Sequence, residues 1–176
     1  LGRADVRPDS AMGYRAAASA SADMPENGNA GAGTGASVGK MFGLSLATKS
    51  GVGTASMNIG GGVTVGALVA VNAIGDVVDP ASGRVLAGAR GADGQPLDSV
   101  AALLRGDLPA RALAGMATTI GVVATDAALS KAQANRLATM AHDGLARCIR
   151  PVHTMTDGDT LFTLATGGSV RAGDMT

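Results

Sequence analysis

The sequence predicts an α/β domain, and three observations support this prediction. Residues 118–126 are mostly β-branched and small apolar residues, a composition typical of a buried strand. Soon afterwards, Ser130 and Gln133 form a capping box at the start of a helix whose apolar side chains recur on one face as far as Cys148. The 27 glycines are spread along the chain without a repeat, which favours a turn-rich, closely packed domain over a collagen-like one.

Length and composition exclude several functions. At 176 residues the chain suits one domain with a sizeable core. Lysine plus arginine and aspartate plus glutamate total 14 each, so no net charge attracts nucleic acid or a membrane surface. Aromatic residues make up 2%, too few for stacking bases, and the longest apolar run, residues 63–74, is too short to span a bilayer. Because Cys148 is the single cysteine and no export signal opens the chain, we expect a cytoplasmic protein.

The first half of the chain is predicted to alternate a helix, a loop and strands. Asp9 and Ser10 indicate a helix start. Three strand-like runs follow at residues 42–48, 52–59 and 63–72, separated by glycines. A short helix is expected over residues 97–104. Residues 105–117 are then predicted to be an exposed linker that leads into the strand at residue 118.

Residues 28–40 form a glycine-rich segment that ends in Lys40. Residues 31–36 have the residue types of the dinucleotide-binding fingerprint but not its context, because no buried strand precedes them and no acidic residue follows at about 20 residues. The phosphate-loop pattern fails because Gly35 is one residue too close to the Gly-Lys pair. Two interpretations stay open: a turn where backbone packs on backbone, or a loop that approaches a substrate while Lys40 supplies a positive charge. We favour the second.

Thr118 is the candidate nucleophile. A threonine at the head of a buried strand is ordinary by itself. If the peptide bond between Ala117 and Thr118 is cut, however, one residue carries both a hydroxyl and a free α-amine. That pair is a nucleophile with its own base. An exposed linker directly before the threonine is what such a cut requires.

Other polar residues stand at strand ends. Asn72 ends the third strand-like run, where its amide must find hydrogen-bond partners. Asp157 and Asp159 precede a strand at residues 161–166, either as a solvated turn or as carboxylates that hold an ammonium group. His142 and Cys148 do not share a helical face and no cluster supports them, so we predict neither a metal site nor a cofactor.

Several motifs, taken together, resemble one enzyme family. They are residues 31–36, 51–56, 64–69, 118–126, 141–144 and 151–160, in the family's order. The combination closely resembles the peptidase family of L-aminopeptidase/D-esterases, β-peptidyl aminopeptidases and nylon-oligomer (6-aminohexanoate oligomer) hydrolases. The resemblance extends over essentially the whole chain.

This resemblance implies a four-layer αββα sandwich of the self-processing, N-terminal-nucleophile kind. It implies one catalytic domain over residues 1–176 that lacks its N-terminal part and final helix. Cleavage would assign residues 1–117 to an α-subunit and residues 118–176 to a β-subunit. Lys40, Asn72, Asp157 and Asp159 fall where the nylon-oligomer hydrolase branch has its other active-site residues. The expected substrate is a short peptide or amide oligomer, and processed units are expected to form homo-oligomers.

The residue before the nucleophile departs from the family pattern. Ala117 stands where asparagine or glycine is usual, which predicts slow cleavage. In the expected mechanism the Thr118 amine takes the hydroxyl proton, an acyl-enzyme forms, and Asn72 helps to hold the oxyanion. Two alternatives stay open: acyl transfer, as in ornithine acetyltransferases, which have a similar fold, and a non-processed binding protein with a degraded site.

Overall fold

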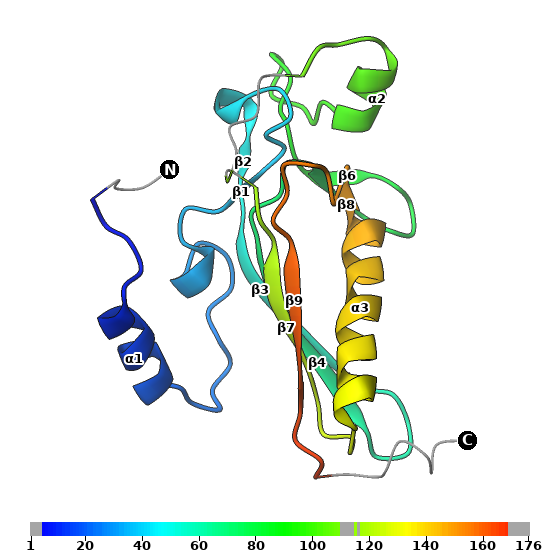
Figure 1. Cartoon of the computed structure of the whole chain (residues 1–176). Coiled ribbons are helices and arrows are strands. Elements are labelled where there is room, and N and C mark those ends of the chain that lie inside the picture. Colours follow the sequence, from blue (N-terminus) through cyan, green and yellow to red (C-terminus); the bar gives the residue numbers. More distant parts are fainter. Residues whose placement is uncertain (1–4, 110–114, 116, 169–176) are drawn as a thin grey trace.

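The structure is a computed structural model, and it describes residues 5–109, 115 and 117–168. Its centre, within these residues, is a four-stranded sheet with the strand order β3-β4-β7-β9 (Figure 1). The strands are β3 (Gly51–Asn58), β4 (Thr64–Val71), β7 (Ile120–Thr125) and β9 (Thr160–Ala165). Neighbours from β3 to β7 are antiparallel, whereas β7 and β9 are parallel.

Smaller elements surround this sheet. Two further sheets pair β1 (Ser37–Val38) with β2 (Thr48–Lys49), and β5 (Asp76–Val78) with both β6 (Val85–Ala87) and β8 (Ile149–Arg150). The helices are α1 (Ser10–Ala18), α2 (Ser99–Leu104) and α3 (Lys131–Cys148), with 3-10 turns η1 (Gly31–Gly33) and η2 (Leu44–Leu46). None of the described helices combines the length and hydropathy needed to cross a membrane.

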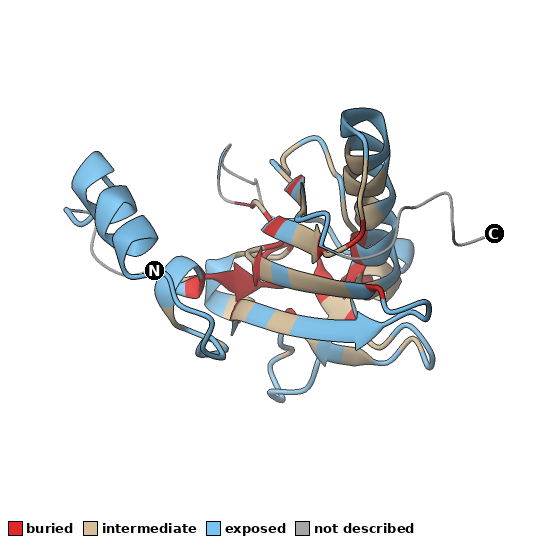
Figure 2. Ribbon diagram, turned by 90° about the horizontal axis from the view of Figure 1, so that it is seen from below, coloured by how far each residue is buried: buried red, intermediate tan, exposed pale blue. Residues whose placement is uncertain are grey.

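Helix α3 confirms the predicted capping box. The backbone N–H of Gln133 donates to Ser130 Oγ (3.3 Å), and the backbone N–H of Ser130 donates to Gln133 Oε1 (2.8 Å). These bonds satisfy N–H groups that the first turn of a helix leaves without partners. The start of α1 is confirmed as well, because the Asp9 side chain accepts a hydrogen bond from Met12 N. No residue of α1 is buried, and the helix projects away from the sheets (Figure 2).

The core lies between α3 and one face of the four-stranded sheet. Leu161 of β9 and Leu145 of α3 are each 8% exposed and belong to one buried apolar cluster with Ile149. The opposite face of the sheet is apolar but exposed. It presents Phe162 and, on β7, Val122, its Cα partner in the register. In an αββα sandwich the face of a sheet turned away from its helices packs against the second sheet.

Two sequence predictions are wrong for the described residues. The run at 42–48 is not one strand, because Gly43 has φ 109° and the chain turns there into η2. The predicted exposed linker ends in a buried residue: Ala117 is 3% exposed and packs with Met41 and Ile74. It is buried because it extends the pairing of β7 with the segment before β9, through a bridge to Asp157. Residues 110–114 and 116 of that linker lie outside the described residues.

Candidate active site

Thr118 lies two residues before β7 and lines a pocket of about 240 Å³. Because successive side chains of an extended segment alternate, Thr118 points to the sheet face away from α3, whereas Thr119 is fully buried on the other side. The lining residues carry no charge; they are Ala32, Thr34, Gly35, Ala36, Ala70, Asn72, Thr118 and Ile120. The pocket therefore joins the glycine-rich segment to the ends of β4 and β7. A larger groove, about 680 Å³, runs between α3 and β9 and includes none of the predicted site residues.

Asn72 connects Thr118 to Lys40. Its backbone carbonyl oxygen accepts hydrogen bonds from Thr118 N (2.9 Å) and from Lys40 Nζ (2.9 Å). Its side-chain Oδ1 accepts a second bond from Lys40 Nζ (2.7 Å) and one from the backbone N–H of Ser37 (3.1 Å). Asn72 follows the last residue of β4, so the strand end turns its polar groups toward the head of β7. Three residues that are far apart in the sequence thus share one hydrogen-bonded site.

The environment of Lys40 weakens its hold on a proton. The residue is 7% exposed, and burial lowers the pKa of its ammonium from 10.5 to about 8, although the Asp157 carboxylate acts in the opposite direction and raises it. An amine with a pKa near 8 is about one-tenth neutral at pH 7. Lys40 can therefore exchange a proton with a neighbouring group under ordinary conditions, as a general base or acid must.

The two carboxylates of the Asp-Gly-Asp turn have different surroundings. Asp157 Oδ2 accepts a hydrogen bond from Thr154 N (2.8 Å), whereas its buried Oδ1 has no hydrogen-bond partner among the described residues. Asp159 has both oxygens occupied: Oδ1 accepts from Thr119 N (2.8 Å), and Oδ2 lies 2.9 Å from His153 Nδ1. Asp157 thus acts on Lys40 through its charge, and Asp159 holds the residue next to Thr118.

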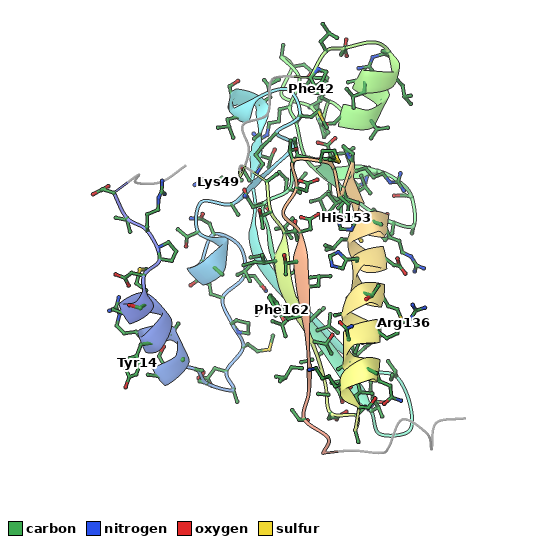
Figure 3. The ribbon with its side chains drawn as sticks, in the orientation of Figure 1. Tyr14, Phe42, Lys49, Arg136, His153 and Phe162 are labelled. Carbon is green, nitrogen blue, oxygen red and sulfur yellow. The ribbon has the colours of Figure 1, made fainter. Side chains whose placement is uncertain are left out.

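His153 is a site neighbour that sequence reasoning missed. Figure 3 shows His153 beside α3. Besides its contact with Asp159, its ring lies 4.9 Å from the ring of His142 in α3. The backbone of His153 has φ 55°, which is unusual for a residue with a side chain. No spacing pattern in the sequence marks this residue, because the turn that brings it back to Asp159 depends on that backbone conformation. No three His, Cys, Asp or Glu residues among those described are placed to hold a metal ion.

The glycine-rich segment combines features of both interpretations. Gly28 and Val52 exchange backbone hydrogen bonds (2.7 and 2.8 Å), and a Cβ on Gly33 or Gly51 would overlap the neighbouring backbone. The backbone-on-backbone interpretation is therefore confirmed for these glycines. Gly35, in contrast, faces the pocket beside Thr118. That part of the segment is available to a substrate.

For the amide hydrolysis that the family resemblance implies, we expect Asp157→Asn and Asp159→Asn each to lower kcat/KM by about 100-fold, the usual size of a lost acid–base or charge contribution. Melting temperatures should change little, since asparagine keeps an oxygen for Thr154 N or Thr119 N. Removing the Asp157 charge should also lower the pKa of Lys40, because that charge raises it. The measurements are steady-state kinetics and thermal melts, with Asp143→Asn on the exposed side of α3 as the control. Full activity in both variants would show that the two aspartates only form the turn and take no part in the reaction.

The chain is similar in sequence to known proteins. Residues 3–175 match the model of peptidase family S58. An uncharacterized aminopeptidase of Mycobacterium tuberculosis is 48% identical over 172 residues, which cover 95% of this chain and 48% of that protein. A 6-aminohexanoate-oligomer endohydrolase of a Kocuria species is 34% identical over 164 residues, which cover 92% of this chain and 45% of that protein. The chain spans about half the length of these curated relatives.

Solved structures are similar as well. The L-aminopeptidase D-Ala-esterase/amidase of Ochrobactrum anthropi, described as a variant of the Ntn hydrolase fold, matches with a TM-score of 0.60 at 25% identity, over 89% of this chain and 37% of that one. A β-aminopeptidase of a Burkholderia species matches with a TM-score of 0.58 at 32% identity, over the same shares. The predicted α/β sandwich of the N-terminal-nucleophile kind is therefore confirmed. The chain belongs to peptidase family S58.

Proposed function

We propose that this chain carries the catalytic centre of a self-processing amidohydrolase in which Thr118 becomes the N-terminal nucleophile. The observation that carries the proposal is the shared acceptor at Asn72: its carbonyl oxygen binds both the nitrogen of Thr118 and the ammonium of Lys40. The amide nitrogen that cleavage would turn into an α-amine thus lies beside a lysine with a lowered pKa. This is the environment that a threonine needs to act as nucleophile with its own amine as base.

The same geometry supports a route for self-cleavage, which is an attack within the chain and needs no exposed residue before Thr118. Neutral Lys40 takes the hydroxyl proton of Thr118, and Oγ1 attacks the carbonyl carbon of Ala117. The C–N bond of the peptide then breaks, and the nitrogen of Thr118 receives the proton from Lys40. The product is an ester between Ala117 and Thr118 Oγ1. Water opens this ester and leaves a carboxylate on Ala117 and a free amine and hydroxyl on Thr118.

Hydrolysis of a substrate uses the products of that cut. The α-amine of Thr118 takes the proton of its own hydroxyl, Oγ1 attacks the substrate's amide carbonyl, and the leaving amine carries the proton away. Water then hydrolyses the acyl-enzyme. The side-chain NH₂ of Asn72 is the proposed oxyanion donor, because Lys40 and Ser37 fix its Oδ1 and so set the orientation of the amide.

The proposed substrates are short peptides or ω-amino acid oligomers. Relatives named aminopeptidase and 6-aminohexanoate-oligomer endohydrolase support this class. The uncharged pocket beside Thr118 suits an aliphatic acyl group, whereas Asp157 is the charge that would attract a substrate ammonium. We also propose, from the family resemblance and the single cysteine, a homo-oligomer of processed units located in the cytoplasm.

The experiment that tests this function is to follow the intact mass of the purified protein with time. We expect slow cleavage between Ala117 and Thr118, because Ala117 lacks the amide group that asparagine would offer for polarising the carbonyl. Within the residues given, the pieces contain 117 and 59 residues (176 − 117 = 59). N-terminal sequencing of the smaller piece should read Thr-Thr-Ile-Gly-Val. A protein that stays uncut yet hydrolyses amides would refute the amine as the base.

A further inference from the structure

The carbonyl oxygen of Ala117, on which charge develops in the proposed self-cleavage, already has two hydrogen-bond donors. The backbone N–H of Gly158 donates to it at 3.0 Å, and the hydroxyl of Thr118 donates to it at 2.6 Å. The hydroxyl must give up its bond in order to attack. The N–H of Gly158 remains in place throughout the reaction.

This donor is rigidly held. Ala117 is 3% exposed and forms a parallel β-bridge with Asp157. Asp157 is fixed in turn by Thr154: its backbone N–H donates to Thr154 O (3.0 Å), and its Oδ2 accepts from Thr154 N (2.8 Å). A donor that needs no rearrangement stabilises a developing negative charge most effectively.

Residue 158 also has a steric requirement. A Cβ added to Gly158 would lie 2.9 Å from Thr118 Oγ1, closer than carbon and oxygen atoms normally approach, and 3.9 Å from the Ala117 oxygen. The atom that such a Cβ would meet first is Oγ1, the proposed nucleophile. Glycine is therefore the residue that brings an N–H to the Ala117 oxygen while leaving room for the Thr118 hydroxyl.

We propose that the backbone N–H of Gly158 is the oxyanion donor of self-cleavage, a role that rests on the proposed function. When Oγ1 bonds to the carbonyl carbon of Ala117, the C=O π electrons move onto the oxygen that Gly158 holds. Collapse of this oxyanion breaks the C–N bond and gives the ester. A substrate acyl group on Thr118 Oγ1 has the same ester connectivity, and Gly158 is exposed. Once the Ala117 carbonyl has left, the same N–H is in position to serve the substrate's oxyanion.

The simplest alternative is that the hydrogen bond from Gly158 N–H to the Ala117 oxygen only stabilises the strand pairing. A backbone ester at residue 158 distinguishes this structural role from the role of an oxyanion donor. Cys148 is the single cysteine, so synthetic residues 148–176 can be joined by native chemical ligation to recombinant residues 1–147. Replacing the N–H of residue 158 by an ester oxygen removes the donor without adding a side chain. The matched control places the ester at Thr160, whose N–H donates to Thr119 O (2.9 Å) in the same strand pair.

We expect the ester at residue 158 to slow cleavage by 100- to 1,000-fold relative to the all-amide protein made in the same way, the usual loss for one oxyanion donor. The ester at residue 160 should slow it by less than threefold, with a similar change in melting temperature. Equal rates for the two esters would overturn the role of Gly158 but leave the proposed function standing. An all-amide protein that never cleaves would overturn both.

A recombinant variant tests the steric requirement without refolding. Gly158→Ala should slow cleavage at least 100-fold in protein that melts as a folded domain. Gly144→Ala in α3, where an added Cβ meets nothing within 4 Å, should cleave at the unchanged rate. Cleavage of Gly158→Ala at the rate of Gly144→Ala would show that the space beside the Thr118 hydroxyl is not needed. It would overturn the inference that residue 158 must be glycine.

Discussion

Replacing Thr118 by alanine is expected to abolish self-cleavage and to lower kcat/KM for amide hydrolysis by at least about 10⁴-fold, as removal of a nucleophile typically does. One hydroxyl serves both reactions in the proposed mechanism, so both should disappear together. The fold should persist, because the only described hydrogen bond of that hydroxyl is to the neighbouring Ala117 carbonyl. Intact mass, a peptide or amide-oligomer assay and a thermal melt are the three measurements.

Two matched variants make the Thr118 result specific. Thr118→Ser keeps a hydroxyl on the same Cβ and should retain cleavage. Thr119→Val removes a hydroxyl that is buried on the opposite face and has no hydrogen-bond partner among the residues that the structure describes. That change should preserve activity and raise stability by about 1 kcal/mol, because an unsatisfied buried hydroxyl is replaced by a methyl group of similar shape. If Thr119→Val were inactive and Thr118→Ala active, the nucleophile would be one residue further along the strand.

Lys40→Met is expected to slow self-cleavage by about 100-fold or more, the usual contribution of a general base. In the uncut protein the nitrogen of Thr118 is still an amide, so Lys40 is the amine available to take the hydroxyl proton. Since burial lowers its pKa to about 8, the neutral form grows as the pH rises through 8. The wild-type cleavage rate should therefore rise up to about pH 8 and level off above it. In Lys40→Met this inflection should disappear.

The control for Lys40 is Lys49→Met, on an exposed lysine of β2 (Figure 3). It should cleave at the wild-type rate at every pH. The melting temperature of Lys40→Met should be unchanged or higher, because burial already disfavours the ammonium, and Asn72 keeps Ser37 N and Thr118 N as donors. Rapid cleavage by Lys40→Met with an intact pH inflection would assign the base to another group.

Local patterns in the sequence predicted the elements that build the sheet and its covering helix. The capping box at Ser130 predicted the start of α3, and β-branched runs predicted β7 and β9, because these signals act between residues close in the chain. The strand predicted for residues 42–48 was wrong. Gly43 interrupts it with a positive φ that composition alone does not reveal.

The site was harder to predict, because its contacts join distant segments. The bonds between Lys40 and Asn72 cross 32 positions of sequence, and only the family resemblance suggested that these residues meet. Gly158 lies between the predicted site residues Asp157 and Asp159, yet what it supplies to the proposed self-cleavage is a backbone N–H and room for the Thr118 hydroxyl. Neither is visible in a side-chain pattern. The burial of Ala117 was missed because small residues are equally common in linkers and in close-packed strand ends.

The position of Thr118 in the sheet has a consequence for the processed protein. A cut there would leave β4 in one piece and β7 in the other, although the two strands are paired over six residues. The strand pair β5–β8 would be divided in the same way. The product would be a heterodimer held by two shared sheets, and its reassembly after unfolding would require two molecules to meet. Its melting should depend on concentration, and its lifetime should be set by the rate at which the sheets open.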